Sequence, residues 1–169
     1  MWGYRCIERL SSYQGEMKKI KLRGHHLFCL QVVNLQGDPI YNPKHCANNR
    51  KFQEMMCSNP NEGIEIVRYC GDTCAFCPSW KENDNKCILY DYEDGANKID
   101  MDMLESLDLE IGDEITSKEL RRRIKNKFGD TLPDMCNWAC PFAEILQCGE
   151  GLKRIKTVEA RVMNPVIIF

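Results

Sequence analysis

Seven cysteines in two short segments are the residues of this 169-residue chain best suited to chemistry. They are Cys70, Cys74, Cys77 and Cys87 in the first segment, and Cys136, Cys140 and Cys148 in the second. The closest neighbours are separated by two or three residues. Such short gaps let thiolates turn toward one ion or cluster, because a tight turn brings the sulfurs together. The spacing therefore predicts a thiolate-ligated metal centre that ties the middle of the chain to its end.

A zinc ion and an iron–sulfur cluster are the two centres that this donor set indicates. Zinc favours four-cysteine sites built from two short pairs, which Cys74/Cys77 and Cys136/Cys140 could supply. A Cys-Pro step at the end of a short-spaced run is typical of iron–sulfur ligands, and each segment here has one. Aromatic residues flank both segments and could limit solvent access to the centre. They are Phe76, Trp80, Trp138 and Phe142. We predict a [4Fe-4S] cluster with zinc as the alternative; inert buried cysteines and stand-alone disulfides are less favoured interpretations.

Six cysteines are the predicted metal ligands. They are Cys74, Cys77, Cys87, Cys136, Cys140 and Cys148. The first three rank highest, and Cys136 ranks last. Cys29 and Cys70 are held in reserve, because eight thiolates would suffice for two four-cysteine clusters.

A histidine–cysteine constellation follows Arg23 and could contact the same cofactor. On a helix, His25 and Cys29 lie one turn apart on one face, whereas His26 points elsewhere. Such a pair could line a cofactor site, lower the pKa of the thiol or relay a proton. It could equally be a packing pair, with Cys29 as a small core residue. We treat His25, His26 and Cys29 as candidate cofactor-binding residues, and expect His25 to hydrogen-bond the cluster or one of its ligands.

Local signals place these residues on mainly helical elements. Apolar residues predict a buried helix over 25–35. Asn42, directly before a proline, predicts the start of a second helix that runs to about residue 57. A capping box at Thr116 predicts a third helix, which Gly129 ends.

Strand and loop signals complete the predicted fold. The mostly alternating stretch 64–69 predicts a short strand, and the irregular stretch 70–97 is typical of a loop that a bound centre orders. His45 and Cys46 lie on a polar helix and are expected at the surface. The fold we predict is therefore α+β and predominantly helical, with short strands and long cysteine-rich loops around a metal centre.

Composition and charge limit the partners and the location. The 23 basic and 25 acidic residues give a net charge of −2, so no nucleic acid or anionic membrane is expected as a partner. No run of about 18 apolar residues is present, and the start lacks the apolar core of a signal peptide. We expect a cytoplasmic protein with an N-terminal extension over 1–19 and a single domain over 20–169. Met17 is an alternative start of translation.

An ordered set of motifs runs along most of the chain. The motifs are Leu22-Arg23-Gly24-His25-His26-Leu27-Phe28-Cys29-Leu30, Tyr41, the Asn49-containing helix, Asp72-x-Cys74-x2-Cys77-Pro78 with Cys87, Met103-Leu104-x2-Leu107-x-Leu109-x2-Gly112, Cys140-Pro141-Phe142 and Cys148-x2-Gly151-Leu152. This set resembles the DUF1284 family of small bacterial and archaeal proteins. The likeness covers about residues 20–155 and implies iron–sulfur binding without implying a reaction. The gap between Cys136 and Cys140 is wider than the two residues expected from the family, and the N-terminal extension has no counterpart in it.

The predicted function is iron–sulfur binding, with one [4Fe-4S] cluster or two, in electron transfer with a redox partner protein. Two alternatives from other classes remain open. In the first, three cysteines hold a cluster with one open iron, and the helix of His25, His26 and Cys29 makes the protein an enzyme. In the second, zinc staples an interaction module that has no redox role. The oligomeric state is left open.

Overall fold

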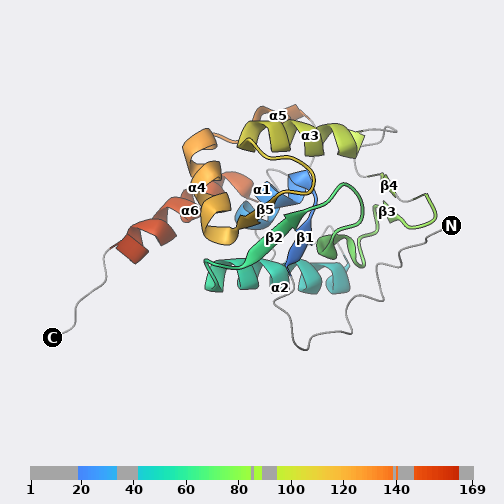
Figure 1. The fold of residues 1–169 in the computed structure, drawn as a ribbon, viewed down its shortest axis with the longest axis horizontal. Coiled ribbons are helices and arrows are strands. Elements are labelled where there is room, and N and C mark those ends of the chain that lie inside the picture. The colour runs from blue at the N-terminus through green and yellow to red at the C-terminus, as the bar shows by residue number, and fades with distance from the viewer. Residues whose placement is uncertain are drawn as a thin grey trace.

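The computed structural model describes residues 19–33, 42–84, 86–88, 95–138, 140 and 147–163. Its helices are α1 (Gly24–Val32), α2 (Pro43–Ser58), α3 (Gly95–Leu107), α4 (Ser117–Phe128), α5 (Asp134–Trp138) and α6 (Cys148–Met163). Its strands are β1 (Ile20–Leu22), β2 (Gly63–Ile66), β3 (Trp80–Lys81), β4 (Lys86–Cys87) and β5 (Glu114–Thr116), and a 3₁₀ turn spans Asp72–Cys74. The predicted α+β fold, predominantly helical with short strands, is confirmed (Figure 1).

A small mixed sheet forms one side of the core. Strand β2 lies between β1, to which it is parallel, and β5, to which it is antiparallel. The register pairs Ile20 with Ile64 and Leu22 with Ile66, and Ile64 also pairs with Ile115. All five of these side chains are buried. The alternation therefore places one face of each strand against the helices.

Local capping chemistry begins two helices where the sequence predicts them. The side chain of Asn42 accepts a hydrogen bond from the backbone N–H of His45 at 2.8 Å, which caps α2. The side chain of Thr116 accepts one from the N–H of Glu119 at 3.3 Å, which caps α4. Gly129 ends α4 with a φ of 56°, in the left-handed region that favours glycine. These predicted boundaries are confirmed.

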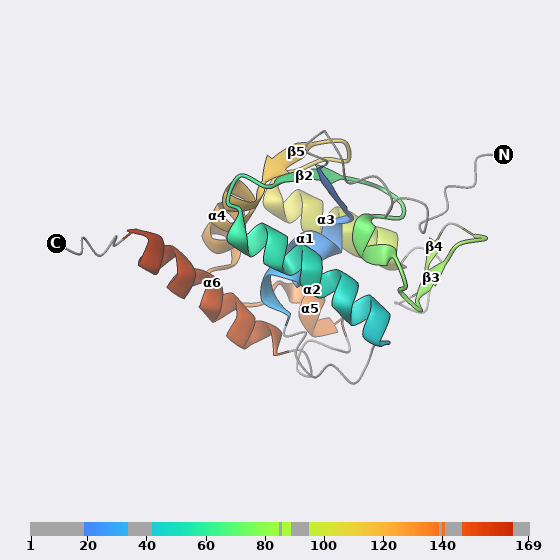
Figure 2. The same ribbon diagram turned by 90° about the horizontal axis from the view of Figure 1, so that it is seen from below.

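Helix α1 runs through the middle of the domain and contacts α2, α3, α4 and α6 (Figure 2). Most of its side chains are buried, as expected for a helix that is apolar on nearly every side. At its first residue, α3 passes so close that a side chain on Gly24 would collide with the backbone of Asp100. A glycine at this position therefore lets the start of α1 dock onto α3.

The expectation that His45 and Cys46 lie at the surface is wrong, because both are buried. The polar face of α2 packs on the backbone of the turn that follows β2. Asn48 Nδ2 donates to the carbonyl of Asp72 at 2.9 Å, and His45 Nδ1 lies 3.4 Å from the carbonyl oxygen of Ala75. A polar helix face can be buried when its groups find hydrogen-bond partners, which composition alone does not show.

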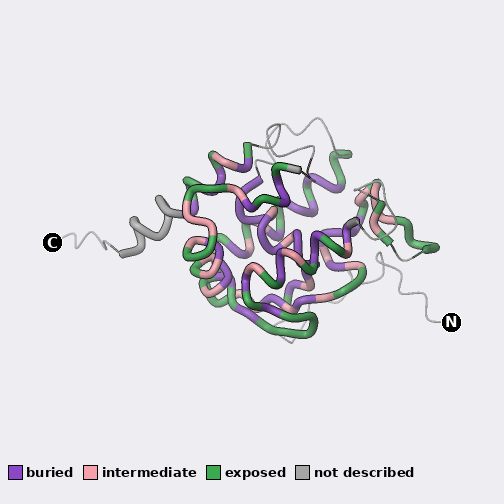
Figure 3. The backbone as a smooth tube through the Cα atoms, turned by 90° about the horizontal axis from the view of Figure 1, so that it is seen from above, coloured by how far each residue is buried: buried purple, intermediate pink, exposed green. Residues whose placement is uncertain are grey.

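The stretch 70–97, predicted to be irregular, contains regular structure in addition to the 3₁₀ turn over Asp72–Cys74. Strands β3 and β4 form a two-stranded hairpin in which Trp80 pairs with Cys87, and α3 already begins at Gly95. The hairpin lies at the edge of the domain, where its residues are exposed or half-buried (Figure 3). The predicted extension over 1–19 falls, except for Lys19, outside the described residues. In the described part of the chain, no helix has the length and apolar character needed to cross a bilayer.

Candidate metal centre

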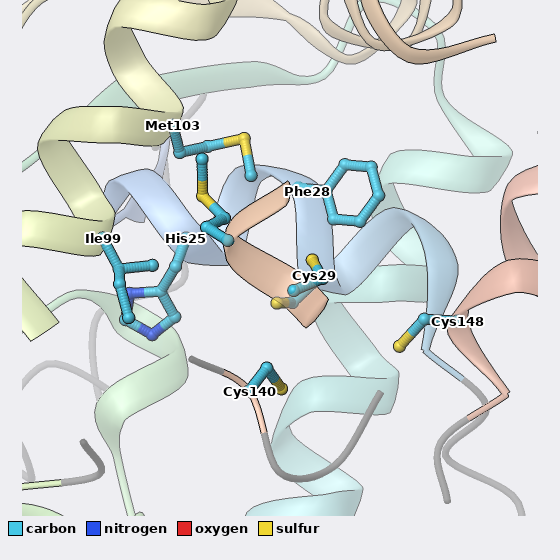
Figure 4. Close-up of a pocket in the computed structure, with 9 residues that line it drawn as sticks. His25, Phe28, Cys29, Ile99, Met103, Cys140 and Cys148 are labelled. Carbon is cyan, nitrogen blue, oxygen red and sulfur yellow. The ribbon is translucent and has the colours of Figure 1, made fainter. Parts of the chain in front are cut away.

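A cavity beside α1 brings four cysteines together (Figure 4). The lining residues are His25, Phe28, Cys29, Ile99, Met103, Met135, Cys136, Cys140 and Cys148. We refer to Cys29, Cys136, Cys140 and Cys148 as the cavity thiols. Apart from His25, the other lining side chains are apolar, so the cavity presents soft sulfur donors in an apolar shell.

Packing between helices assembles the cavity thiols from distant segments. Cys29 lies one turn after His25 on α1, as predicted, and Cys148 is the first residue of α6. Helix α6 approaches α1 so closely that a side chain on Gly151 would collide with the backbone of Val32. Glycine at this position therefore lets Cys148 reach the cavity that Cys29 lines.

Burial and mutual repulsion raise the pKa values of three cavity thiols, Cys29, Cys136 and Cys148. Burial, reinforced by negative charge on Cys140 and Cys148, raises the pKa of Cys136 to about 12. Burial and the charge of Cys140 raise the pKa of Cys148 to about 11. The pKa of Cys29 is raised well above its ordinary value, first by burial and then by the other cavity thiols. A metal centre would replace these protons, because its positive charge stabilises the thiolates.

A second group of three cysteines surrounds the β3–β4 hairpin, and we call Cys74, Cys77 and Cys87 the hairpin thiols. Cys74 ends the 3₁₀ turn, and the N–H of Cys77 donates to its carbonyl at 3.0 Å. The N–H of Trp80 donates to the carbonyl of Cys77 at 3.1 Å, and Trp80 pairs with Cys87 across the hairpin. Consecutive tight turns thus bring these three residues together, as their spacing in the sequence predicts.

Polar and charged groups next to Cys74 and Cys77 stabilise the thiolate forms of these two residues. Burial raises the pKa of Cys74 to about 12, against a backbone hydrogen bond at Gly71 and the positive charge of Arg23, both of which lower it. Burial also raises the pKa of Cys77, against hydrogen bonds from the turn that follows it and, again, the charge of Arg23. Backbone hydrogen bonds and the charge of Arg23 therefore partly offset the effect of burial on the pKa values of Cys74 and Cys77.

Helix α2 fixes the backbone that carries Cys74 and Cys77. Besides the contacts of Asn48 and His45 described above, Asn42 Nδ2 donates to the carbonyl of Phe76 at 2.9 Å. Phe76 has a φ of 63°, an uncommon backbone conformation for an aromatic residue. Phe76 is 38% exposed. Trp80 is half-buried, whereas Phe142 and the side chain of Trp138 lie outside the described residues.

The structure divides the six predicted ligands into two groups of three. Cys74, Cys77 and Cys87 form the hairpin thiols, whereas Cys136, Cys140 and Cys148 share the cavity with the reserve ligand Cys29. The four cysteines considered for a single zinc site are therefore split between the two groups. Cys70, the other reserve ligand, is disulfide-bonded. Within the described ranges, no three Cys, His, Asp or Glu side chains form a ready-made site for a single metal ion.

The comparison with protein families covers the hairpin thiols and half of the cavity thiols. Residues 41–146 match the model of the family described as "Protein of unknown function (DUF1284)". The chain belongs to the DUF1284 family. The matched stretch includes the hairpin thiols and two of the cavity thiols, Cys136 and Cys140. Searches of the curated proteins and of the solved structures found no match for this DUF1284 protein.

The two adjacent histidines of this DUF1284 protein face different surroundings, as predicted. His25 lines the cavity, and its Nδ1 lies 2.5 Å from Oδ1 of Asp100. His26 Nδ1 lies 2.8 Å from the hydroxyl of Thr73, next to the hairpin thiols in the chain. Burial, followed by the charges of His25 and of other cations, lowers the pKa of His26 well below its ordinary value. His26 is therefore neutral and structural, whereas His25 is the histidine that a bound cofactor would meet.

Asp100 is a site residue that the sequence analysis missed. It lies 75 residues after His25 and carries no motif of its own. One signal was available: in the helical pattern of α3, Asp100 shares a face with Met103, Leu104 and Leu107, all of which are buried. An acidic residue on an apolar helix face indicates a buried partner, because a buried carboxylate without one is very costly.

Proposed function

We propose that the cavity thiols hold an iron–sulfur cluster of the [4Fe-4S] type and that this DUF1284 protein exchanges electrons with a partner protein. The observation that carries the proposal is the convergence of four cysteines, one from α1 and three from the stretch 136–148, on one cavity. Four thiolates are the usual ligand set of such a cluster. When bound, the cluster supplies one-electron redox chemistry.

The surroundings of the cavity thiols suit a cluster. Phe28, Ile99, Met103 and Met135 line the space between them, and an apolar shell limits water access and tunes the reduction potential. The cavity thiols would lose their protons to bind. His25, held at the edge of the cavity, would lie within the second layer of groups that adjust the potential of the centre.

Metal and sulfide analysis of the protein purified without oxygen tests the proposal. We expect brown protein that contains iron and acid-labile sulfide. Colourless protein with zinc would overturn the cluster and favour a zinc-stapled interaction module. Protein that binds neither metal, even after incubation with iron and sulfide under reducing conditions, would overturn both.

Serine variants test which thiols hold the cluster. Cys29→Ser and Cys148→Ser should lose most of the iron, because each removes one of the four ligands. Cys74→Ser should keep the iron of the cavity, and Cys57→Ser is the matched control, because Cys57 is exposed on α2. Full iron content in Cys29→Ser would exclude Cys29 as a ligand. Complete loss of iron in Cys74→Ser would contradict the assignment of the cluster to the cavity.

A further inference from the structure

The carboxylate of Asp100 lies between the two groups of thiols and has a separate partner on each side. Its Oδ1 accepts a hydrogen bond from the backbone N–H of His25 at 2.8 Å and lies 2.5 Å from Nδ1 of the same residue. Its Oδ2 accepts from Arg23 Nε at 2.8 Å and from Arg23 Nη2 at 2.6 Å. The Asp100 side chain is only 9% exposed, so these contacts are made away from water. One buried carboxylate therefore fixes two side chains that extend from either end of the Arg23–His25 run.

Arg23 is the partner on the side of the hairpin thiols. Its side chain is 2% exposed, and its guanidinium carbon lies 5.7 Å from the centre of the Trp80 ring. Trp80 pairs with Cys87, so the guanidinium lies beside the hairpin. Its positive charge lowers the pKa of Cys74 and of Cys77. Arg23 thus supplies positive charge that stabilises the thiolate forms of Cys74 and Cys77.

His25 is the partner on the side of the cavity thiols. Asp100 is ionised, because the charges of His25 and Arg23 and the hydrogen bonds from His25 outweigh burial and lower its pKa. An ionised carboxylate only accepts hydrogen bonds, so Nδ1 of His25 must carry the proton. Figure 4 shows the His25 ring at one edge of the cavity and Cys148 at the opposite edge. The Asp100 contact therefore keeps a proton on Nδ1 and sets the orientation of the ring that the cofactor would meet.

We propose that Asp100 is a positioning residue for both groups of thiols: it holds His25 at the edge of the cavity and Arg23 beside the hairpin, and so couples the charge of one group to the other. The expected effect of Asp100 on a cluster rests on the proposed function, whereas the contacts of Asp100 with His25 and Arg23 do not depend on it. A buried charge network of this kind acts strongly, because little water screens it. The negative charge of Asp100 already reaches the cavity, where it contributes to the raised pKa of Cys29.

Asp100→Asn tests the coupling, because it keeps the shape of the side chain and removes its charge. The charge of Arg23 is then uncompensated, so we expect the iron to be retained and the reduction potential of the cluster to become more positive. Asp102→Asn is the matched control, because Asp102 lies on the same helix in a surface pair with Lys98, at 2.7 Å. An unchanged potential in Asp100→Asn, or an equal shift in Asp102→Asn, would overturn the proposal.

A nitrogen-15 NMR spectrum of the histidines gives a second readout that needs no cluster. In the metal-free protein we expect His25 to be protonated at Nδ1, and Asp100→Asn to change that signature while Asp102→Asn does not. A His25 signature that is the same in Asp100→Asn and in the wild type would overturn the proposal, whatever the metal content. If Asp100→Asn does not fold, Asp100→Glu replaces it, because it keeps the charge and displaces the carboxylate; an unchanged His25 signature there is the overturning result. Absence of a cluster from wild-type protein would count only against the proposed function.

Discussion

The cavity thiols and the hairpin thiols differ in how they are assembled and in what surrounds them. The hairpin thiols come from consecutive turns of one short segment, and backbone groups and Arg23 lower the pKa of Cys74 and Cys77. The cavity thiols come from two distant parts of the chain, α1 and the stretch 136–148, and the lining that they share is apolar except for His25. The strongest influences on Cys136, after burial, are the charges of other cavity thiols. The hairpin group thus receives hydrogen bonds from its own turns and positive charge from Arg23, whereas no cationic side chain is among the causes that act on Cys136.

The largest effect expected from this difference is on stability when the metal is removed. Because the cavity thiols join distant segments, the free energy of metal binding becomes free energy of folding. Chelation under reducing conditions should lower the Tm by about 10 °C or more, since 1 kcal/mol shifts the Tm of a domain of this size by about 2–4 °C. Circular dichroism melting curves, recorded with iron analysis, give the measurement. An unchanged curve after verified loss of iron would show that the protein orders the cavity without a metal.

A smaller effect is expected where α6 meets α1. Gly151→Ala should destabilise the protein by about 1–3 kcal/mol, because the new methyl group collides with the backbone of Val32. It should also lower the iron content, since Cys148 moves with α6. Gly149→Ala is the matched control, because nothing lies within 4 Å of the position of its new carbon. Urea unfolding of both variants provides the test, and equal stability of the two would refute the role of this packing in assembling the cavity.

The smallest effect concerns the reactivity of the hairpin thiols. Only the thiolate is alkylated, and the charge of Arg23 lowers the pKa of Cys74 and Cys77. Arg23→Gln should therefore raise both pKa values, reduce the thiolate fraction at a fixed, mildly alkaline pH and slow alkylation several-fold. Arg23→Lys should react closer to the wild-type rate, because it keeps the charge. Mass spectrometry of the reduced, metal-free protein distinguishes the groups; equal slowing at the cavity thiols would mean a general structural change instead.

Features that depend on neighbouring residues were predictable from the sequence. Asn42 and Thr116 cap their helices as predicted, because a cap involves a side chain and an N–H three residues later. The proximity of Cys74 and Cys77 follows from their spacing in the same way. The strand predicted over 64–69 ends at Ile66, however, because β2 pairs with β5 only through residues 63–65 and the chain bends at 68–69.

Features that depend on tertiary packing were not predictable in the same way. The meeting of Cys29 with Cys148 requires α6 to contact α1 at Gly151, and no local pattern encodes that contact. The burial of His45 was missed because its hydrogen-bonding surroundings belong to a distant turn. Asp100 was missed because its partners lie far away in the sequence. In each case the role of a polar or small residue depends on contacts with residues that lie far away in the sequence.

The position of Cys148 at the first residue of α6 has a consequence for the order of events during synthesis. A growing chain already contains every hairpin thiol once Cys87 has been added, well before α3 is made. The cavity thiols are incomplete until the ribosome reaches Cys148, although Cys29 is made before all of the hairpin thiols. A centre held by all four cavity thiols is therefore inserted late, into a chain whose sheet, first helices and hairpin have already left the ribosome.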